Sequence, residues 1–313
     1  MSNDAHLVSV DQEINTISID CPLMADFSEI VPVASVLDQI EDLPHDNNFE
    51  VVYSALSKLP QHKKVCLELE SAIYTYFNDL KLPDHPTIYD HLILSLREKD
   101  VIATFNWDPF LIQAYSRTPK AFNKRKPKLL FLHGNVLSAY CEKDKVLGVK
   151  GRNCSKCGNL LTHSKLLFPV AKKDYSSNPA ITGDWKSLKE ALRFAFMVTI
   201  FGYSAPTSDA DAKAILQEAW GPCETRSLEQ FEFVDIKSAD ELTELWKGFI
   251  HTHHFDVKND FYDSWIANHP RRTGEAWWNQ DLEAKFISNN PIPRTADFPE
   301  LYGWFERLIK VEA

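Results

Sequence analysis

The sequence predicts an α/β fold in which a doubly wound parallel sheet carries helices on both faces. Two observations predict it: short apolar runs typical of buried strands, and amphipathic helical patterns lying between them. Strands that are covered on both faces have continuous apolar sequences, and an alternation of strands with helices is typical of parallel sheets. A small inserted module with paired cysteines and a C-terminal extension complete the expected organisation.

Four segments have the composition of a buried strand. They are residues 101–105 (VIATF), 129–132 (LLFL), 196–201 (FMVTIF) and 231–236 (FEFVDI). Each is short and either apolar or β-branched, as expected of a strand between two helical layers. Nearer the start of the chain, we expect a further strand at 14–20 and a helix at 27–40.

Three helices are expected from apolar residues spaced i, i+3, i+4 and i+7. They cover residues 89–96, 212–219 and 242–249, which lie before the first, after the third and after the fourth expected strand. Ser238 and Glu241 have the spacing of a capping box at the start of the last helix. Asp209 is expected to cap the helix after the third strand.

The composition excludes several classes of protein. The 313 residues include 34 Lys and Arg against 44 Asp and Glu, a formal net charge of −10, and 44% are hydrophobic. This is enough apolar material for a full core, and the acidic balance argues against a general nucleic-acid binder. No apolar run approaches the ~18 residues of a membrane helix, no signal peptide is visible, and six cysteines are too few for a disulfide scaffold. We therefore expect a soluble cytoplasmic protein.

Two segments interrupt the alternation of strands and helices. Residues 141–168 carry a cysteine pair with clustered Gly, Asn and Lys, and are expected to form a small inserted module within an α/β domain at 1–254. Residues 255–313 contain several tryptophans and prolines and the run HPRR at 269–272. We expect this C-terminal extension to pack on the domain or on a partner.

Polar residues directly follow the expected strands. The first strand is followed by Asn106 and Asp108, the second by His133 and Gly134, and the third by Gly202, Tyr203 and Ser204, while the fourth contains Asp235 near its end. Ligands of open α/β sheets bind beyond the carboxyl ends of the strands. The sequence therefore predicts that these groups converge on one small-molecule site.

Each of these groups also has a purely structural alternative. Asn106 and Asp108 could cap a following helix, with Pro109 in its first turn. His133-Gly134 could be a turn that ends a strand, and 202–204 could be an ordinary turn before the next helix. The occurrence of such groups at three successive strand ends favours a site.

The order of these motifs resembles the sirtuin-like family. The stretch TFNWD at 104–108, the HG pair at 133–134, the CxxC pair at 154–157 and FGYS at 201–204 follow one another as in that family, within residues 87–250. The chain looks most like the bacterial sirtuin-like domains of anti-phage defence proteins, which often hydrolyse NAD. The resemblance implies a Rossmann-like sheet, NAD as substrate and a role in anti-phage defence.

The resemblance also implies roles for individual residues. Asn106 and His133 would be catalytic, with Asp108 orienting the loop or stabilising positive charge. An amide can orient water or a ribose through donor and acceptor, and an imidazole can accept a proton near neutral pH. Residues that would bind the dinucleotide are Thr104, Gly202, Tyr203, Ser204 and Asp235.

One element of the family pattern is missing. Sirtuin-like domains bind the diphosphate with a glycine-rich turn after the first strand, whereas the first glycine of this chain is Gly134. Either another segment around 21–26 supplies the phosphate contacts, or NAD binding is weak or lost. The alternative function is therefore a catalytically inactive scaffold or nucleotide sensor that acts through a protein partner or a homo-oligomer.

The module carries candidate metal ligands. Sirtuins hold a structural zinc with two CxxC pairs, whereas this chain has one, Cys154-Ser-Lys-Cys157, with Cys141 upstream and His163 downstream. Three thiolates and an imidazole form a reasonable tetrahedral zinc site. The alternative is a metal-free knuckle with free thiols.

Overall fold

The computed structural model describes Leu37 and residues 49–170, 173–176, 178–203, 209–226, 228–250, 254–295 and 297–312. The strand expected at 14–20 lies outside this part of the chain, as does the helix expected at 27–40 apart from Leu37. Among the residues described, no helix combines the length and the apolar character needed to cross a membrane.

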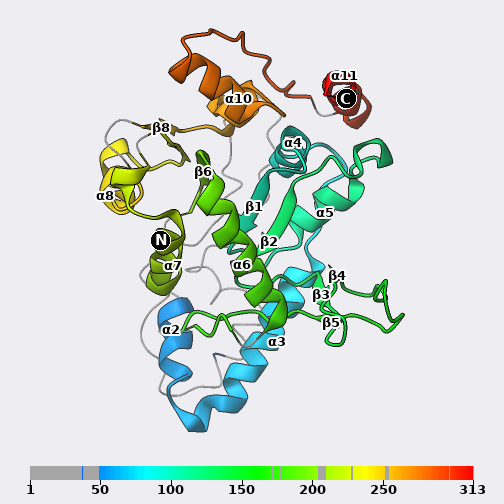
Figure 1. Cartoon of the computed structure of the whole chain (residues 1–313). Coiled ribbons are helices and arrows are strands. Elements are labelled where there is room, and N and C mark those ends of the chain that lie inside the picture. The colour runs from blue at the N-terminus through cyan, green and yellow to red at the C-terminus, as the bar shows by residue number, and fades with distance from the viewer. Residues whose placement is uncertain are drawn as a thin grey trace.

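Within the described residues, five parallel strands form the centre of the molecule in two groups (Figure 1). The first pair is β1 (Val101–Thr104) with β2 (Lys128–Phe131), and the second group is β6 (Met197–Phe201), β7 (Gln230–Val234) and β8 (Phe255–Lys258) in that order. All four expected strands are confirmed. β8 was not expected as a strand, and it begins where the C-terminal extension was expected to start.

Helices cover both faces of these strands, which confirms the α/β class. On one face lie α4 (Ile88–Ser95) and α5 (Phe110–Arg117), and on the other lie α6 (Pro179–Phe194), α7 (Ala210–Trp220) and α8 (Ala239–Trp246). Successive residues of a strand point to opposite faces. Phe131, the last residue of β2, packs in the apolar core beneath α4 and α5, whereas Leu130 of β2 and Leu132 just after it pack in the core beneath α6, α7 and α8.

Capping explains where several helices begin. Ser238 and Glu241 form the expected capping box of α8, and Asn178 accepts hydrogen bonds at the start of α6, where Pro179 occupies the first turn. The expected side-chain cap by Asp209 on α7 is wrong. Asp209 stands at the cap position, but its carboxylate makes no capping hydrogen bond and pairs with Lys173 instead.

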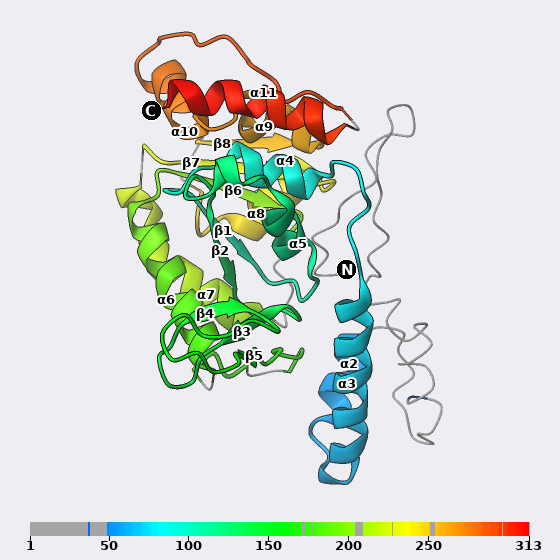
Figure 2. The same ribbon diagram turned by 90° about the vertical axis from the view of Figure 1, so that its right-hand side faces the viewer.

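A third apolar cluster lies beyond the carboxyl ends of β1 and β2. It is formed by α2 (Phe49–Leu56) and α3 (Lys63–Asp79) with Leu37, and it includes Trp107 and Val136 from the loops that follow the two strands. Figure 2 shows α2 and α3 standing beside the main body of the molecule. These helices therefore border the edge at which the predicted site lies.

The cysteine-containing module is a small antiparallel sheet. Its strands are β3 (Ser138–Tyr140), β4 (Leu147–Val149) and β5 (Thr162–His163) in the order β4-β3-β5. The module thus begins a few residues before the expected start at 141, and it follows directly from the loop after β2.

The C-terminal extension packs on the domain. After β8 it forms α9 (Trp265–Asn268), α10 (Thr273–Trp277) and α11 (Phe298–Val311), and α11 lies across α9 and α4 (Figure 2). Arg271 of the HPRR run is buried, donates hydrogen bonds to the carbonyls of Leu94 and Leu96, and pairs with Glu312. This arginine therefore holds the extension in place instead of presenting a charge at the surface.

Candidate functional site

The ends of β1, β2 and β6 meet at one edge of the molecule, which we call the rim. The register pairs Thr104 with Phe131, and the amide of Leu132 donates to the carbonyl of Thr104 at 2.9 Å. Two positions further along the chain from the paired residues, Asn106 and His133 leave the sheet at the same level. The register therefore places both residues just beyond the carboxyl ends of their paired strands.

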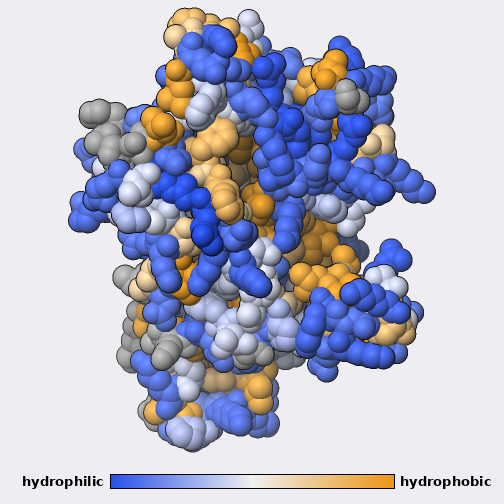
Figure 3. All heavy atoms as spheres, in the orientation of Figure 1, coloured by the Kyte–Doolittle hydropathy of each residue, from blue (hydrophilic) through white to orange (hydrophobic). Residues whose placement is uncertain are grey.

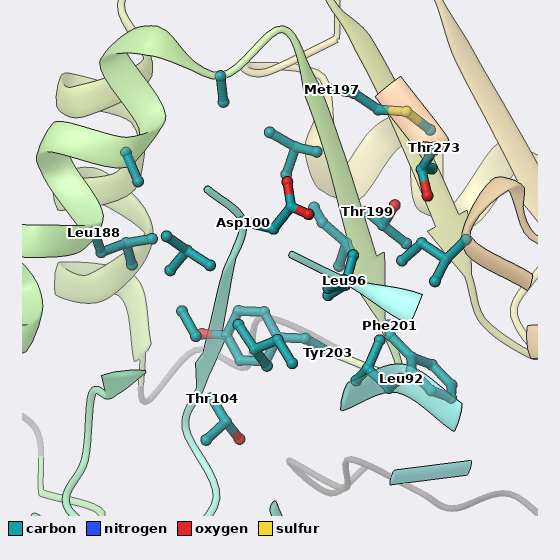
Figure 4. A pocket seen from close by; sticks show the side chains of 18 of the residues that line it. Leu92, Leu96, Asp100, Thr104, Leu188, Met197, Thr199, Phe201, Tyr203 and Thr273 are labelled. Carbon is teal, nitrogen blue, oxygen red and sulfur yellow. The ribbon is translucent and has the colours of Figure 1, made fainter. Parts of the chain in front are cut away.

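A cavity of about 700 Å³ lies between β1 and β6 and ends at the rim (Figure 4). Five of the predicted site residues line it, namely Thr104, Asn106, Asp108, Gly202 and Tyr203. His133 and Asp235 do not line it, and Ser204 lies outside the described residues. The expectation that Asn106, His133 and Ser204 share a cleft therefore stays a prediction.

Asp108 is buried behind Asn106 at the end of β1. Its Oδ1 accepts a hydrogen bond from the amide of Phe110 at 2.9 Å, so it supports the start of α5 as the structural alternative foresaw. Burial raises the pKa of Asp108 to about 6, opposed by the hydrogen bonds from Phe110 and the Asn106 side chain. Asn106 is only half-buried, and its backbone amide donates to the hydroxyl of Thr104 at 3.0 Å.

His133 is held in a largely aromatic environment. Only 4% of it is exposed, with the Phe105 ring 4.7 Å away in an edge-on arrangement and the Tyr175 ring stacked at 6.0 Å. Its Nε2 atom has no hydrogen-bond partner among the described residues, and Asp209 Oδ1 lies 3.7 Å from it. Burial lowers the pKa of His133 to about 3 despite the nearby carboxylate, so the imidazole is neutral at pH 7.

Asp209 belongs to a buried ion pair beside this imidazole. Its carboxylate is fully buried, pairs with Lys173 Nζ and accepts a hydrogen bond from the Tyr203 hydroxyl at 3.0 Å. Burial, reinforced by the Asp209 charge, raises the pKa of Tyr203 far above its ordinary value. Sequence reasoning missed both ionic residues, because Asp209 resembled a helix cap and Lys173 stands 36 residues away with no spacing pattern.

Phe105 connects the three strand ends. Its ring contacts His133 and stacks on Tyr203 with the ring centroids 4.4 Å apart. Because Phe105 follows β1, His133 follows β2 and Tyr203 follows β6, one aromatic residue fixes the relative positions of all three. These contacts pack the Phe105 ring directly against the buried imidazole.

A backbone requirement explains the glycine after His133. Gly134 has φ +82°, and a Cβ atom there would lie 2.1 Å from the carbonyl oxygen of Lys165. The residue therefore needs both the conformational freedom and the small size of glycine. This turn directs the chain from His133 into the module, in agreement with the structural alternative for this pair.

Asp235 holds a turn at the end of β7. Its Oδ1 accepts a hydrogen bond from the amide of Lys237 at 2.9 Å, just before α8 begins. The carboxylate is buried and does not reach the cavity.

The module brings together four potential metal ligands. One donor atom from each of Cys141, Asp144, Cys154 and Cys157 lies within 4.8 Å of the others. Asp144 Oδ2 is 3.4 Å from Cys154 Sγ, and the Sγ atoms of Cys141 and Cys157 are 3.6 Å apart. Three thiolates and one carboxylate are a donor set that zinc accepts.

His163, expected as the fourth ligand, is not part of this group. It is exposed on β5, and its ring lies 5.7 Å from that of Tyr74 on α3. Asp144, three residues after Cys141, takes the place expected for His163. An aspartate in a short loop is so common that its spacing gave no signal in the sequence.

Comparison with known proteins finds similar solved structures, but no similar family model or curated protein. Among solved structures, Sir2Tm bound to a propionylated peptide is 16% identical, with a TM-score of 0.32 over 60% of this chain and 73% of that one. A Sir2 homologue–NAD complex is 12% identical, with a TM-score of 0.34 over 83% and 78% of the two chains. A mutant Sir2 homologue in complex with ADP-ribose is 12% identical, with a TM-score of 0.38 over 91% and 92%. At these values, the likeness carries no argument about activity.

Proposed function

We propose that the rim binds NAD and hydrolyses the bond between its nicotinamide and ribose. The observation that carries this proposal is the placement of Asn106 and His133 at one level of the sheet, with a buried imidazole whose Nε2 is unpartnered among the described residues. Buried polar atoms are normally hydrogen-bonded, and exceptions often have a chemical role. The neighbouring ion pair of Lys173 and Asp209 adds fixed charges close to this atom.

The proposed reaction needs few groups from the protein. A water oxygen bonds to the anomeric carbon of the ribose while the carbon–nitrogen bond breaks, and its electron pair leaves with neutral nicotinamide. His133 accepts the proton that the water loses, which requires the substrate and its water to hydrate the imidazole, because burial holds its pKa at about 3 and makes it a weak base. Asn106 orients the water or the ribose. Asp108, with its pKa near 6, is mainly ionised at pH 7 and can stabilise positive charge on the ribose.

The remaining rim residues would bind the dinucleotide. Thr104, Gly202 and Tyr203 line the cavity at the ends of β1 and β6. Ser204, the next residue in the sequence, and Asp235 after β7 are further candidates. Since the Tyr203 hydroxyl is engaged with Asp209, Tyr203 would contact the nucleotide through its ring. In the cell, we propose that the protein depletes NAD in the cytoplasm during phage infection, with a protein partner or a second copy as regulator.

A non-catalytic role is the second candidate. Two observations favour it: His133 is only 4% exposed, and the first 133 residues contain no glycine for a phosphate-binding turn. In this case, the rim would bind a nucleotide or a partner without reaction.

Product analysis separates the two candidates. The chain is incubated with NAD, alone and with candidate activating partners, and nicotinamide and ADP-ribose are quantified. Release above that of the His133→Ala and Asn106→Ala variants supports the hydrolase. Equal background release in all three, together with saturable NAD binding, supports the sensor.

We also propose that the module holds one structural zinc ion through Cys141, Cys154, Cys157 and Asp144. The carboxylate oxygen is a harder ligand than a thiolate, but it completes a four-donor set of suitable size. When bound, the ion would tie the β3–β4 turn to the CxxC loop.

A further inference from the structure

Lys173 and Asp209 form a charge pair that is removed from water beside His133. On the face of the molecule in Figure 3, hydrophilic side chains cover most of the surface, and apolar atoms gather around hollows. This pair, in contrast, lies inside, since only 3% of the Lys173 side chain and none of the Asp209 side chain is exposed. The burial of two charges is costly, and their attraction seldom leaves a net gain in stability. The position of the pair therefore suggests a task other than stabilising the fold.

The Asp209 carboxylate accepts hydrogen bonds on both of its oxygens. Oδ1 pairs with Lys173 Nζ, and Oδ2 accepts a hydrogen bond from the Tyr203 hydroxyl at 3.0 Å. A carboxylate paired with a cation is ionised and can only accept hydrogen bonds. The imidazole of His133 also faces it, with Nε2 3.7 Å from Oδ1 and without a hydrogen-bond partner among the described residues. A nitrogen that faces this oxygen is favoured when it carries a proton.

The neutral imidazole of His133 has its proton on only one of the two ring nitrogens. With the proton on Nδ1, the lone pair of Nε2 would lie next to the negative charge of Asp209. With the proton on Nε2, the positive end of an N–H bond lies there instead. The rings of Phe105 and Tyr175 pack on the imidazole, and the Tyr175 hydroxyl makes no hydrogen bond with the described residues. The carboxylate therefore decides the tautomer.

We propose that Asp209 is a positioning residue that holds His133 as the Nε2–H tautomer, so that Nδ1 accepts the proton of the attacking water. This inference rests on the proposed hydrolase. As the water oxygen bonds to the anomeric carbon, one O–H bond breaks and its proton moves to Nδ1. The imidazole becomes a cation whose Nε2–H group faces Asp209, and the proton passes to solvent after the products leave. Catalytic hydrogen bonds that are long in a free enzyme often tighten in the reacting complex.

The charges beside the imidazole change its basicity in opposite directions. Burial lowers the pKa of His133 most, the Asp209 carboxylate raises it, and the Lys173 ammonium lowers it further. Asp209 therefore offsets part of the effect of burial, in the direction that a base needs. The Tyr203 hydroxyl holds the same carboxylate, and the Tyr203 ring stacks on Phe105, which contacts His133. These contacts fix the carboxylate relative to the imidazole.

Nuclear magnetic resonance of the wild-type protein tests the tautomer without NAD. Histidine with isotopically labelled ring nitrogens is incorporated, and the signals of His133 are identified by their loss in His133→Gln. Long-range proton–nitrogen correlations distinguish the two ring nitrogens, and a nitrogen that carries a proton resonates far from a bare one. We expect a protonated Nε2 and a bare Nδ1 at neutral pH. A bare Nε2, or protons on both nitrogens, would overturn the proposal.

The double variant Lys173→Met with Asp209→Asn tests whether the carboxylate is the cause. It leaves no unpaired buried charge. The Tyr203 hydroxyl can keep its hydrogen bond to the amide oxygen, which puts the amide NH₂ group in the place of Oδ1, opposite Nε2. We therefore expect the imidazole proton to move to Nδ1. The kcat of nicotinamide release should fall about 10²–10⁴-fold, the range of general-base assistance, with little change in KM.

Lys186→Met with Asp211→Asn is the matched control, because it makes the same two changes at exposed positions of α6 and α7. It should keep both the tautomer and the kcat of the wild type. A Lys173→Met/Asp209→Asn protein that retains the Nε2–H tautomer, or whose kcat equals that of the control, would refute the positioning role. If the variant does not fold, the wild-type spectrum decides the tautomer by itself.

Failure of this inference differs from failure of the proposed function. If the wild type releases no nicotinamide under any condition, the hydrolase is wrong, and the spectra still show whether Asp209 sets the tautomer of His133. If the wild type releases nicotinamide but Nε2 is bare, the hydrolase stands and Asp209 is not its positioning residue.

Discussion

Asp209 Oδ1 lies 3.7 Å from His133 Nε2, and both side chains are almost completely buried. The same carboxylate pairs with Lys173, so the imidazole faces a charge that is compensated from its other side. A buried charge pair adds little net stability, but the removal of one partner leaves an uncompensated charge in a low dielectric. The ion pair of Lys173 and Asp209 therefore fixes the charges beside the imidazole and adds little to the net stability of the fold.

Lys173→Met should destabilise the protein strongly. It leaves the fully buried Asp209 carboxylate without its cation, and we expect the free energy of unfolding to fall by about 3–5 kcal/mol. Urea denaturation measures the change. Lys186→Met, at an exposed position of α6, serves as control and should have little effect. The double variant Lys173→Met with Asp209→Leu should recover most of the loss, and failure to recover would contradict the ion-pair argument.

His133→Ala and Asn106→Ala should abolish nicotinamide release. Loss of general-base assistance lowers a rate by about 10²–10⁴-fold, and loss of an orienting amide is expected to be of comparable severity. Initial rates of nicotinamide and ADP-ribose formation give the comparison. His163→Ala replaces an exposed histidine on β5 of the module that has no role in the proposed reaction, and it should retain the wild-type rate. Unchanged release from the His133→Ala variant would remove that residue from the mechanism.

The strands and their polar ends could be predicted because these signals are local. Apolar runs of four to six residues mark β1, β2, β6 and β7, and the residues that follow a parallel strand must lie at its carboxyl edge. β8 was missed because its sequence FDVK alternates apolar and charged residues, unlike a strand buried on both faces.

The rest of the site depends on contacts between distant segments. Lys173 and Asp209 meet only in the folded chain, and neither stands in a recognisable motif. The sequence predicted His163 as the fourth ligand, and Asp144, although it stands only three residues after Cys141, gave no signal. The order β4-β3-β5 of the small sheet decides between them, because it places His163 on an edge strand while the turn after β3 brings Asp144 to the thiols.

His133 should make stability depend on pH in the acidic range. The pKa of the imidazole is about 6.5 in the unfolded chain and about 3 in the folded one. Between these values only the unfolded state binds the proton, so the free energy of unfolding falls as the pH drops below 6.5, by up to about 1.4 kcal/mol per pH unit. His133→Gln removes this contribution.

The difference between the two proteins isolates the effect. The pKa of Asp108 is raised to about 6 by burial and gives a slope of opposite sign, but both proteins share it. Urea denaturation of each at about pH 7 and about pH 5.5 should show a larger acid-induced loss in the wild type. Equal losses would mean that His133 is hydrated or already charged in the folded state.

Zinc binding should depend on Asp144 and not on His163. We expect near-stoichiometric zinc in protein purified without chelator, and Cys154→Ser or Asp144→Ala should lower both zinc content and melting temperature, because each removes one of four donors. Elemental analysis and thermal unfolding measure the two quantities. His163→Ala should keep the metal, since that side chain lies outside the donor group. Zinc loss in His163→Ala with retention in Asp144→Ala would reverse the ligand assignment.

Gly134→Ala should destabilise the rim more than any exposed glycine substitution. Gly134 and Gly151 have similar positive φ angles, +82° and +77°, so alanine strains the backbone at both. At Gly134 the added Cβ would also lie 2.1 Å from the Lys165 carbonyl oxygen, whereas at Gly151 it meets nothing within 4 Å. The backbone strain alone costs roughly 1–2 kcal/mol. The close contact at Gly134 can be relieved only by moving the His133-Gly134 turn or the chain around Lys165.

We therefore expect Gly151→Ala to lose about 1–2 kcal/mol of unfolding free energy. Gly134→Ala should lose clearly more, and it should also lose nicotinamide release. Equal losses in urea denaturation would show that the chain at 165 yields easily and that the turn does not position His133.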